Sequence, residues 1–302
     1  MSYHIVSIDS PDCYITVSKG QLQSSSNGTV NSVPLEDVAA IVITSFKCTI
    51  SNNLLIQSAK SKVPIVICES FSPISILLPT DRATDTLLIR NLAKLTPQHK
   101  RRLWKKTLDA KCNNQYKLST QWAPDHPLIS TMQHIVESSK ETKEAECAKC
   151  YWTIFSDVFT NGQFRRDRKK KDINVLFNYA YAILLSCVLR YLLALGIDPT
   201  FGIFHTSRAH AAPLAYDLME PFRTLFDEKI ANWLNLISYT PQTSPNNLIT
   251  KEFKLYITST LADSIIYGNK TVSLKLAIEQ TVRSFRAAVC SLQVGTYEPW
   301  KI

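Results

Sequence analysis

The chain has 302 residues, 45% of them hydrophobic, so it can bury a sizeable core in one large or two ordinary domains. Its net charge of +9 and isoelectric point near 9.1 favour a polyanionic partner, nucleic acid before membrane. The opening residues lack the basic and apolar segments of a signal peptide, so we expect a cytoplasmic protein whose eight cysteines are reduced and mostly buried.

Residues 1–80 predict a small β-rich, sandwich-like domain. Short runs rich in Val, Ile, Thr and Tyr alternate with turn residues, a pattern typical of strands. The predicted strands are residues 3–8, 13–18, 38–44, 63–68 and 74–78, with turns at 9–12, 19–20 and 24–28. Ser51 is a suitable N-cap for one helix over residues 52–61.

After Pro79 the composition shifts, and we expect a domain boundary at residues 80–85. Helical spacing then dominates, with predicted helices at residues 84–95, 98–122, 142–159, 173–196, 214–236 and 271–292. The apolar stretch at 179–195 is interrupted by Ser186 and Arg190, which favours a buried helix over a membrane span. The predicted fold class is α+β, with an all-α catalytic domain over residues 86–302 following the β-rich domain.

A histidine and two acids stand close together in the sequence: His205, Asp217 and Glu220. These are suitable donors for a hard or borderline divalent metal. On a helix the two acids would share a face, and Pro221 predicts that this helix begins, kinks or ends nearby. Such a pair is more often solvated, but apolar neighbours of Asp217 argue against full solvation. A lone histidine like His205, expected at a strand-to-loop corner, is more often a hydrogen-bonded core residue than a ligand.

The predicted helix at residues 142–159 carries two acids and a Cys-x-x-Cys pair. Glu144 and Glu146 are two residues apart and therefore point in different directions. Cys147 and Cys150 have neither a second such pair nor a histidine pair at zinc-finger spacing, and no thioredoxin-like strand precedes them. We expect two packed helix cysteines rather than a zinc or redox site.

Two basic runs suggest contacts with phosphate. Residues 100–106 interleave basic side chains with Trp104, and residues 165–171 are denser in charge. Such a run is usually a solvated segment, but two of them in a basic chain favour backbone or shape recognition of nucleic acid. The candidate DNA-contacting residues are Arg165, Arg166, Arg168, Lys169, Lys170, Lys171 and Arg223.

Several motifs in order, over most of residues 100–223, resemble the CRISPR-associated integrase and endonuclease family of spacer acquisition. They are EAECAKCYW from Glu144, NVLFNYAY from Asn174, and His205 followed by LAYDLMEPFR at 214–223. A weaker upstream motif pairs LW at 103–104 with AK at 110–111 and NQ at 114–115. Ser207 replaces the family's glycine after the histidine. The length and the short DLMEPFR form are similar to the version found in type II systems.

The resemblance implies a Mg²⁺ or Mn²⁺ site held by Glu144, His205 and Glu220, with Asp217 supporting the metal or the histidine. These four residues would be the catalytic set. The implied activity is metal-dependent endonuclease and integrase chemistry, in which short foreign DNA fragments are inserted into a CRISPR array. A 3′-hydroxyl attacks a phosphodiester, so the step is a transesterification, and water in its place gives hydrolysis.

The resemblance also implies partners. These are double-stranded DNA (protospacer, CRISPR repeat and branched DNA), a second copy of the chain joined through the β-rich domain, and a small ferredoxin-like CRISPR adaptation protein. Two dimers flanking that protein would form a heterohexamer, which could contact the type II effector nuclease and accessory proteins. Two alternatives stay open: a non-catalytic basic DNA-binding adaptor whose acids are structural, and a transposon-encoded integrase of the same family. No membrane partner is expected.

Overall fold

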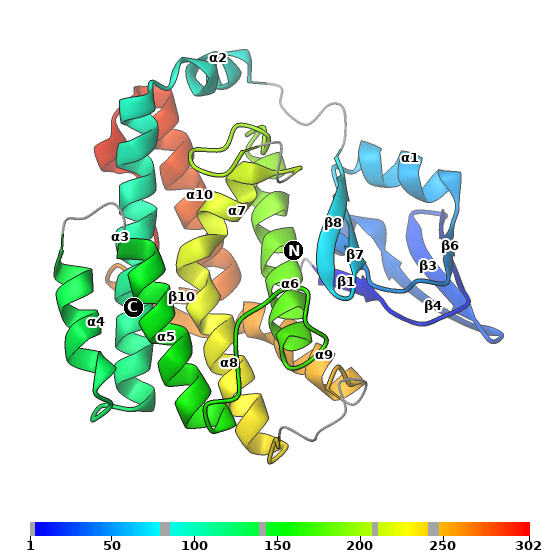
Figure 1. The fold of residues 1–302 in the computed structure, drawn as a ribbon. Coiled ribbons are helices and arrows are strands. Elements are labelled where there is room, and N and C mark those ends of the chain that lie inside the picture. The colour runs from blue at the N-terminus through cyan, green and yellow to red at the C-terminus, as the bar shows by residue number, and fades with distance from the viewer. Residues whose placement is uncertain (1–3, 79–84, 139–142, 207–210, 241–247) are drawn as a thin grey trace.

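A β-rich N-terminal part and a larger helical part make up the protein (Figure 1), which confirms the predicted α+β class. The computed structural model describes residues 4–78, 85–138, 143–206, 211–240 and 248–302. Two features of the sequence lie mostly or wholly outside the described residues: the predicted domain boundary at residues 80–85 and Ser207.

The N-terminal part contains two four-stranded sheets. The first has the order β1 (His4–Ile8), β5 (Val38–Ile43), β7 (Ile65–Glu69) and β8 (Ser72–Leu77), parallel except for β8. The second has the order β4 (Thr29–Pro34), β3 (Gln21–Ser26), β2 (Cys13–Ser18) and β6 (Cys48–Ile50), with β6 parallel to β2 and the other pairs antiparallel. A 3₁₀ turn, η1 (Leu35–Asp37), and helix α1 (Asn52–Lys60) complete this part. Ser51 caps α1 as predicted, because its hydroxyl accepts from the Leu54 amide at 3.1 Å.

The central strand β5 ties the two parts together. Successive side chains of a strand point to opposite faces. Ile41 and Ile43 accordingly join the core of the β-rich part, whereas Val42 joins the core of the helical part. The first sheet is therefore covered on both faces at β5, and the helical part packs directly on this strand.

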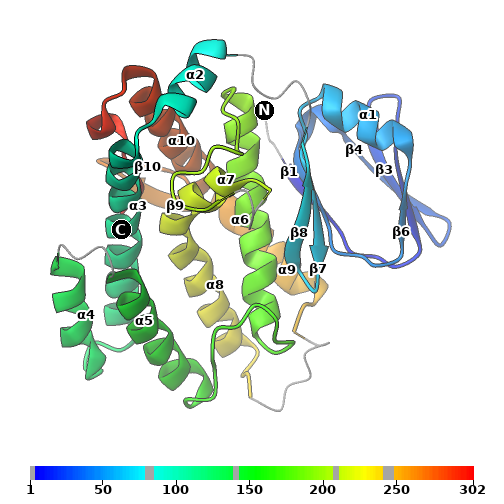
Figure 2. The same ribbon diagram turned by 45° about the horizontal axis from the view of Figure 1, so that its top comes forward.

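The helical part surrounds one buried helix. Its helices are α2 (Thr86–Lys94), α3 (Pro97–Trp122), α4 (Leu128–Glu137), α5 (Lys143–Thr160), α6 (Asn174–Ala194), α7 (Pro213–Met219), α8 (Arg223–Leu236), α9 (Lys251–Ser259) and α10 (Leu274–Ser291). The shorter elements are η2 (Glu220–Phe222), η4 (Thr260–Ala262), η5 (Val294–Thr296) and the hairpin β9 (Ser264–Tyr267) and β10 (Lys270–Ser273). Helix α6 lies between the first sheet and the other helices (Figures 1 and 2). It is long and apolar enough to span a membrane, but 89% of its most apolar 18-residue stretch is buried inside the protein.

Several predicted boundaries are wrong for identifiable reasons. Residues 24–28 are predicted as a turn, but β3 runs to Ser26 because a polar strand can still pair in an antiparallel meander. The predicted helix at 214–236 is interrupted by η2, since Pro221 has no amide hydrogen to continue an α-helix. The helix predicted from residue 271 begins at Leu274, after the unpredicted strand β10. Helices α4 and α9 are not predicted by the sequence pattern.

Candidate active site

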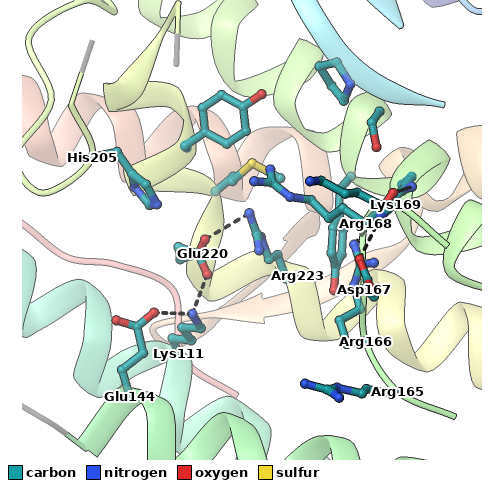
Figure 3. Close-up of a pocket in the computed structure, with 16 residues that line it drawn as sticks. Lys111, Glu144, Arg165, Arg166, Asp167, Arg168, Lys169, His205, Glu220 and Arg223 are labelled. Carbon is teal, nitrogen blue, oxygen red and sulfur yellow. Dashed lines mark hydrogen bonds and ion pairs between the residues drawn. The ribbon is translucent and has the colours of Figure 1, made fainter. Parts of the chain in front are cut away.

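The three predicted metal ligands line one pocket of about 570 Å³ (Figure 3). Glu144 comes from the first turn of α5, Glu220 from η2, and His205 from the segment between α6 and α7. Residues 201–206 contain bends at 203–205 and no strand, so the strand expected before His205 is wrong. The pocket therefore collects side chains from elements far apart in the sequence.

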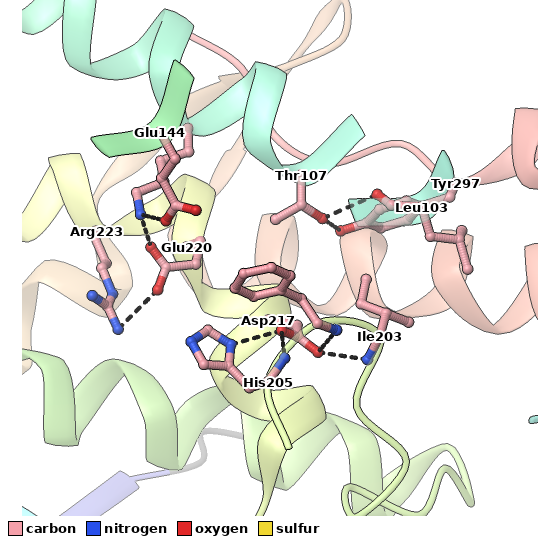
Figure 4. A network of polar contacts seen from close by, with 11 residues as sticks. Leu103, Thr107, Glu144, Ile203, His205, Asp217, Glu220, Arg223 and Tyr297 are labelled. Atoms are coloured by element: carbon pink, nitrogen blue, oxygen red, sulfur yellow. Dashed lines mark hydrogen bonds and ion pairs between the residues drawn. The ribbon is translucent and has the colours of Figure 1, made fainter. Parts of the chain in front are cut away.

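Asp217 organises the segment that carries His205. Its carboxylate accepts hydrogen bonds from the backbone amides of Ile203 (2.7 Å), Phe204 (3.2 Å) and His205 (3.1 Å). It also contacts Nδ1 of the His205 ring at 2.7 Å (Figure 4). Asp217 is fully buried, as its apolar neighbours in α7 predicted. We call these four contacts the Asp217 network. It fixes both the backbone of the segment and the orientation of the imidazole.

The close approach within this segment requires a glycine. A Cβ placed on Gly202 would lie 2.3 Å from the His205 carbonyl oxygen and 2.8 Å from Cβ of Pro213. Both distances are shorter than any tolerated contact. Gly202 thus lets the backbone fold back on itself, so that His205 meets the start of α7.

Glu220 has charged partners instead. Its carboxylate lies 3.0 Å from Arg223 Nη2 and 2.8 Å from Lys111 Nζ, and the same lysine lies 2.7 Å from Glu144 (Figure 3). We call these four residues the Glu220 ion-pair cluster. Burial alone would raise the pKa of Glu220, but Arg223 and Lys111 outweigh it and lower that pKa to about 2. Burial likewise opposes the charge of Lys111, but Glu220 and Glu144 raise its pKa above the ordinary value. The cluster holds two acids and two bases, so its formal charges balance.

The side chains as they stand do not form a closed metal site. Within the described ranges, no three His, Cys, Asp or Glu side chains converge closely enough to hold one ion. The Lys111 ammonium lies between Glu144 and Glu220 and pairs with both, in the position that a metal ion would take. The donor set nevertheless suits Mg²⁺ or Mn²⁺, because carboxylates suit both ions and imidazole suits Mn²⁺. The buried Oε2 of Glu220 also accepts no aligned hydrogen bond, despite its short ion pair with Lys111.

A second buried acid supports this cluster from below. The guanidinium of Arg223 lies over the Tyr181 ring, 4.7 Å from its centroid. The Tyr181 and Tyr151 hydroxyls donate to Asp227 at 2.5 and 2.8 Å. Burial raises the pKa of Asp227 to about 6, although both hydroxyls and the nearby arginines act to lower it. Asp227 therefore anchors the aromatic ring on which Arg223 rests.

The basic segment at residues 165–171 is here called the basic loop, and its first five residues, 165–169, line the pocket (Figure 3). Arg166 is turned inward and donates to Asn174 (2.8 Å) and Asn178 (3.0 Å) on α6. The same two asparagines donate to the carbonyls of Arg165 and Arg168, each at 3.0 Å. The asparagine motif of the sequence thus anchors the basic loop. The loop's remaining cationic side chains, Arg165, Arg168, Lys169, Lys170 and Lys171, are exposed.

The sequence pattern predicts no role for Lys111, Asn174 or Asn178. Each stands in a quoted motif, and that is the only available signal. The two helix cysteines behave as expected, since Cys147 and Cys150 are both buried and unbridged. Glu146 points to solvent, as its spacing from Glu144 predicted.

The chain is similar to known proteins along most of its length. The family model for CRISPR associated protein Cas1 matches residues 6–251. A CRISPR-associated endonuclease Cas1 of Neisseria meningitidis serogroup C (strain 8013) is 29% identical over 281 residues, which cover 91% of this chain and 88% of the relative.

Two solved structures share the fold. A chain of a "Cas6-RT-Cas1--Cas2 complex" has a TM-score of 0.82 and 16% identity. The match covers all of this chain and 36% of the length of the solved chain. A "Casposase bound to integration product" has a TM-score of 0.77 and 17% identity, covering 96% of this chain and 91% of its own.

Proposed function

Because this chain belongs to the Cas1 family of CRISPR-associated proteins, we propose that it is a metal-dependent DNA endonuclease and integrase of spacer acquisition. Its substrate is a short DNA fragment with a free 3′-hydroxyl, which attacks a phosphodiester of a CRISPR repeat. The observation that carries this proposal is the single pocket that His205, Glu144 and Glu220 line beside the basic loop.

In this proposal Glu144, Glu220 and His205 hold a Mg²⁺ or Mn²⁺ ion, with Nε2 as the ligand atom of the histidine. When bound, the ion supplies Lewis acidity at the scissile phosphate and favours ionisation of the attacking hydroxyl. Asp217 binds Nδ1 and so fixes which ring nitrogen is presented to the ion, the usual duty of a carboxylate behind a metal-bound histidine. Lys111 must leave the space between the two acids when the ion enters.

The cations around the pocket then serve the DNA backbone. Arg223 lines the pocket beside Glu220 and is positioned on Tyr181, where it can neutralise a phosphate oxygen. The exposed side chains of the basic loop bind the phosphates on either side of the reacting one. This contact pattern recognises backbone rather than base sequence.

We propose that the chain works with a second copy of itself and with a small Cas2-type protein. The support is the likeness to a chain solved in a Cas1–Cas2 complex, together with the family assignment. We propose that the protein works in a type II system, which the similarity of its DLMEPFR segment to the form found there supports.

The test is a half-site integration assay in Mn²⁺ with the Cas2-type partner present. Glu144→Ala and His205→Ala should abolish strand transfer, while DNA affinity in EDTA stays within about twofold of wild type. Glu146→Ala is the matched control, since it removes an exposed acid two residues from Glu144. Near-wild-type integration by both site variants would refute the site. DNA binding by the wild type without metal-dependent cleavage of branched DNA would instead favour the adaptor alternative.

A further inference from the structure

Two stacked aromatic rings stand beside the pocket, and only one of them is covered. The ring centroids of Trp104 and Phe204 are 4.3 Å apart, and the angle between the two ring planes is only 4°. Trp104 is buried, whereas Phe204 is 53% exposed. We call this pair the aromatic platform. One face of Phe204 rests on Trp104, which leaves its outer side to the solvent.

The platform is held rigidly next to the proposed metal ligand. The Phe204 amide donates to Asp217 at 3.2 Å, within the Asp217 network. The His205 ring meets the Phe204 ring edge-on, with centroids 5.5 Å apart. Figure 4 shows α3, marked by Leu103 and Thr107, passing beside the segment that carries Ile203 and His205. A ligand stacking on Phe204 would therefore lose little side-chain entropy, because the ring is already ordered.

Basic residues flank the platform on α3. Lys100 and Arg101 precede Trp104 by one helical turn and so lie on the same face of the helix. Of these two residues Lys100 is half-buried and Arg101 is exposed. An aromatic surface bordered by cations is the arrangement with which proteins hold single-stranded nucleic acid, stacking a base and pairing its phosphates. This is the basic run at 100–106, to which the pocket itself assigns no role.

We propose that Phe204 is the stacking site for one unpaired nucleobase of the DNA strand whose phosphate lies at His205. The inference rests on the proposed function, because it takes DNA as the substrate. Phe204 and His205 are adjacent, so the stacked base belongs to a nucleotide next to the reacting phosphate. Trp104 supports the platform from beneath, and the cations of α3 bind the flanking phosphates. Stacking on a phenyl ring accepts any base, so the site positions the strand without reading its sequence.

The test uses a duplex with single-stranded 3′ ends in which 2-aminopurine replaces one base at a time, with EDTA present so that no reaction occurs. Wild type and Phe204→Tyr should quench the fluorescence at one or two positions near the 3′ end. Phe204→Ala should lose this quenching and bind roughly tenfold more weakly, the usual effect of removing one base–aromatic stack. Phe46→Ala is the matched control, since Phe46 is 77% exposed in the β-rich part.

An abasic site at the quenched position completes the cycle. On that DNA, wild type and Phe204→Ala should bind equally, because there is no base to stack. Unequal binding there, or quenching that persists in Phe204→Ala, would overturn the platform. If neither protein binds any DNA, the proposed function itself fails, and that outcome is distinct from a failure of the platform alone.

Discussion

Asp217 and Glu220 are three residues apart, yet different kinds of partner hold them. Asp217 accepts from three backbone amides and one imidazole, all fixed by the chain around it. Glu220 is held by Lys111 and Arg223, whose long side chains can swing away. Backbone donors cannot be exchanged without unfolding the segment, whereas an ammonium group can give way to another cation. The Asp217 network therefore fixes the backbone of the segment that carries His205, whereas the Glu220 ion-pair cluster holds cationic side chains that another cation can replace.

The largest expected difference is in stability. Asp217→Ala should lower the free energy of unfolding by about 3 kcal/mol, because buried amides lose their shared acceptor. Glu220→Gln should have a smaller effect on the free energy of unfolding. In that variant Lys111 still has its ion pair with Glu144, and Arg223 still has its contact with the Tyr181 ring. Urea unfolding of both variants measures the difference. Equal losses of stability, or a larger loss for Glu220→Gln, would contradict the structural role given to Asp217.

Asp227 is a third buried acid, and its hydrogen-bond donors are the hydroxyls of Tyr151 and Tyr181. Its pKa is raised from 3.8 to about 6 by burial, so between these values the folded protein keeps a proton that the unfolded chain releases. This contribution to stability is fully present below about pH 4 and is lost as the pH rises through 6. Wild type should lose on the order of 2 kcal/mol more than Asp227→Asn over this range.

Chemical unfolding at several pH values measures that difference. Parallel pH profiles for wild type and Asp227→Asn would show that the acid is ionised in the folded protein. The pairing of Asp227 with two neutral tyrosines would then need another explanation.

The third prediction concerns whether a metal ion can replace the ammonium of Lys111. Lys111→Met removes the ammonium between Glu144 and Glu220 while keeping the unbranched stem of the side chain, one atom shorter. Without this competitor, Mn²⁺ should bind roughly tenfold more tightly, a gain of about 1.4 kcal/mol, as followed by electron paramagnetic resonance. Lys117→Met is the control, since Lys117 is exposed further along α3. Weaker Mn²⁺ binding by Lys111→Met would mean that the lysine builds the site rather than competing for it.

The smallest expected effect concerns the exposed part of the basic loop. Replacing Lys169, Lys170 and Lys171 with Gln should reduce the slope of log affinity against log salt by roughly 0.9 for each phosphate that the variant no longer neutralises. The matched control removes three exposed lysines of the β-rich part: Lys19, Lys47 and Lys60. Equal changes of slope in the two triple variants would make the loop an ordinary solvated segment.

Much of the fold follows from local patterns. The apolar strands β2 and β5 and the long helices α3, α5 and α6 begin and end within about two residues of their predicted positions. The strands β3 and β4 escape prediction because their residues are mostly polar and few of them are buried, so pairing rather than burial defines these strands. Pro221 predicts a break, but its exact form as a 3₁₀ turn depends on packing.

The site is predictable only in part. The resemblance to the family implies that Glu144, His205 and Glu220 share a site, and in the structure all three line one pocket. Lys111 cannot be predicted as their counter-ion, because nothing local links it to Glu220 more than a hundred residues away. The inward turn of Arg166 is hidden for the same reason, since the charge pattern cannot show which arginine of a basic run meets Asn174.

The most direct test of the account is Mn²⁺ affinity, measured by electron paramagnetic resonance on five proteins without DNA. We predict that Glu144→Gln, His205→Ala and Glu220→Gln each weaken binding by at least about 100-fold relative to wild type. Glu146→Gln should bind like wild type, because that side chain points away from the pocket. Wild-type affinity in the Glu220→Gln protein would contradict the account, because Glu220 would then be a structural partner of Lys111 and Arg223 and not a metal ligand.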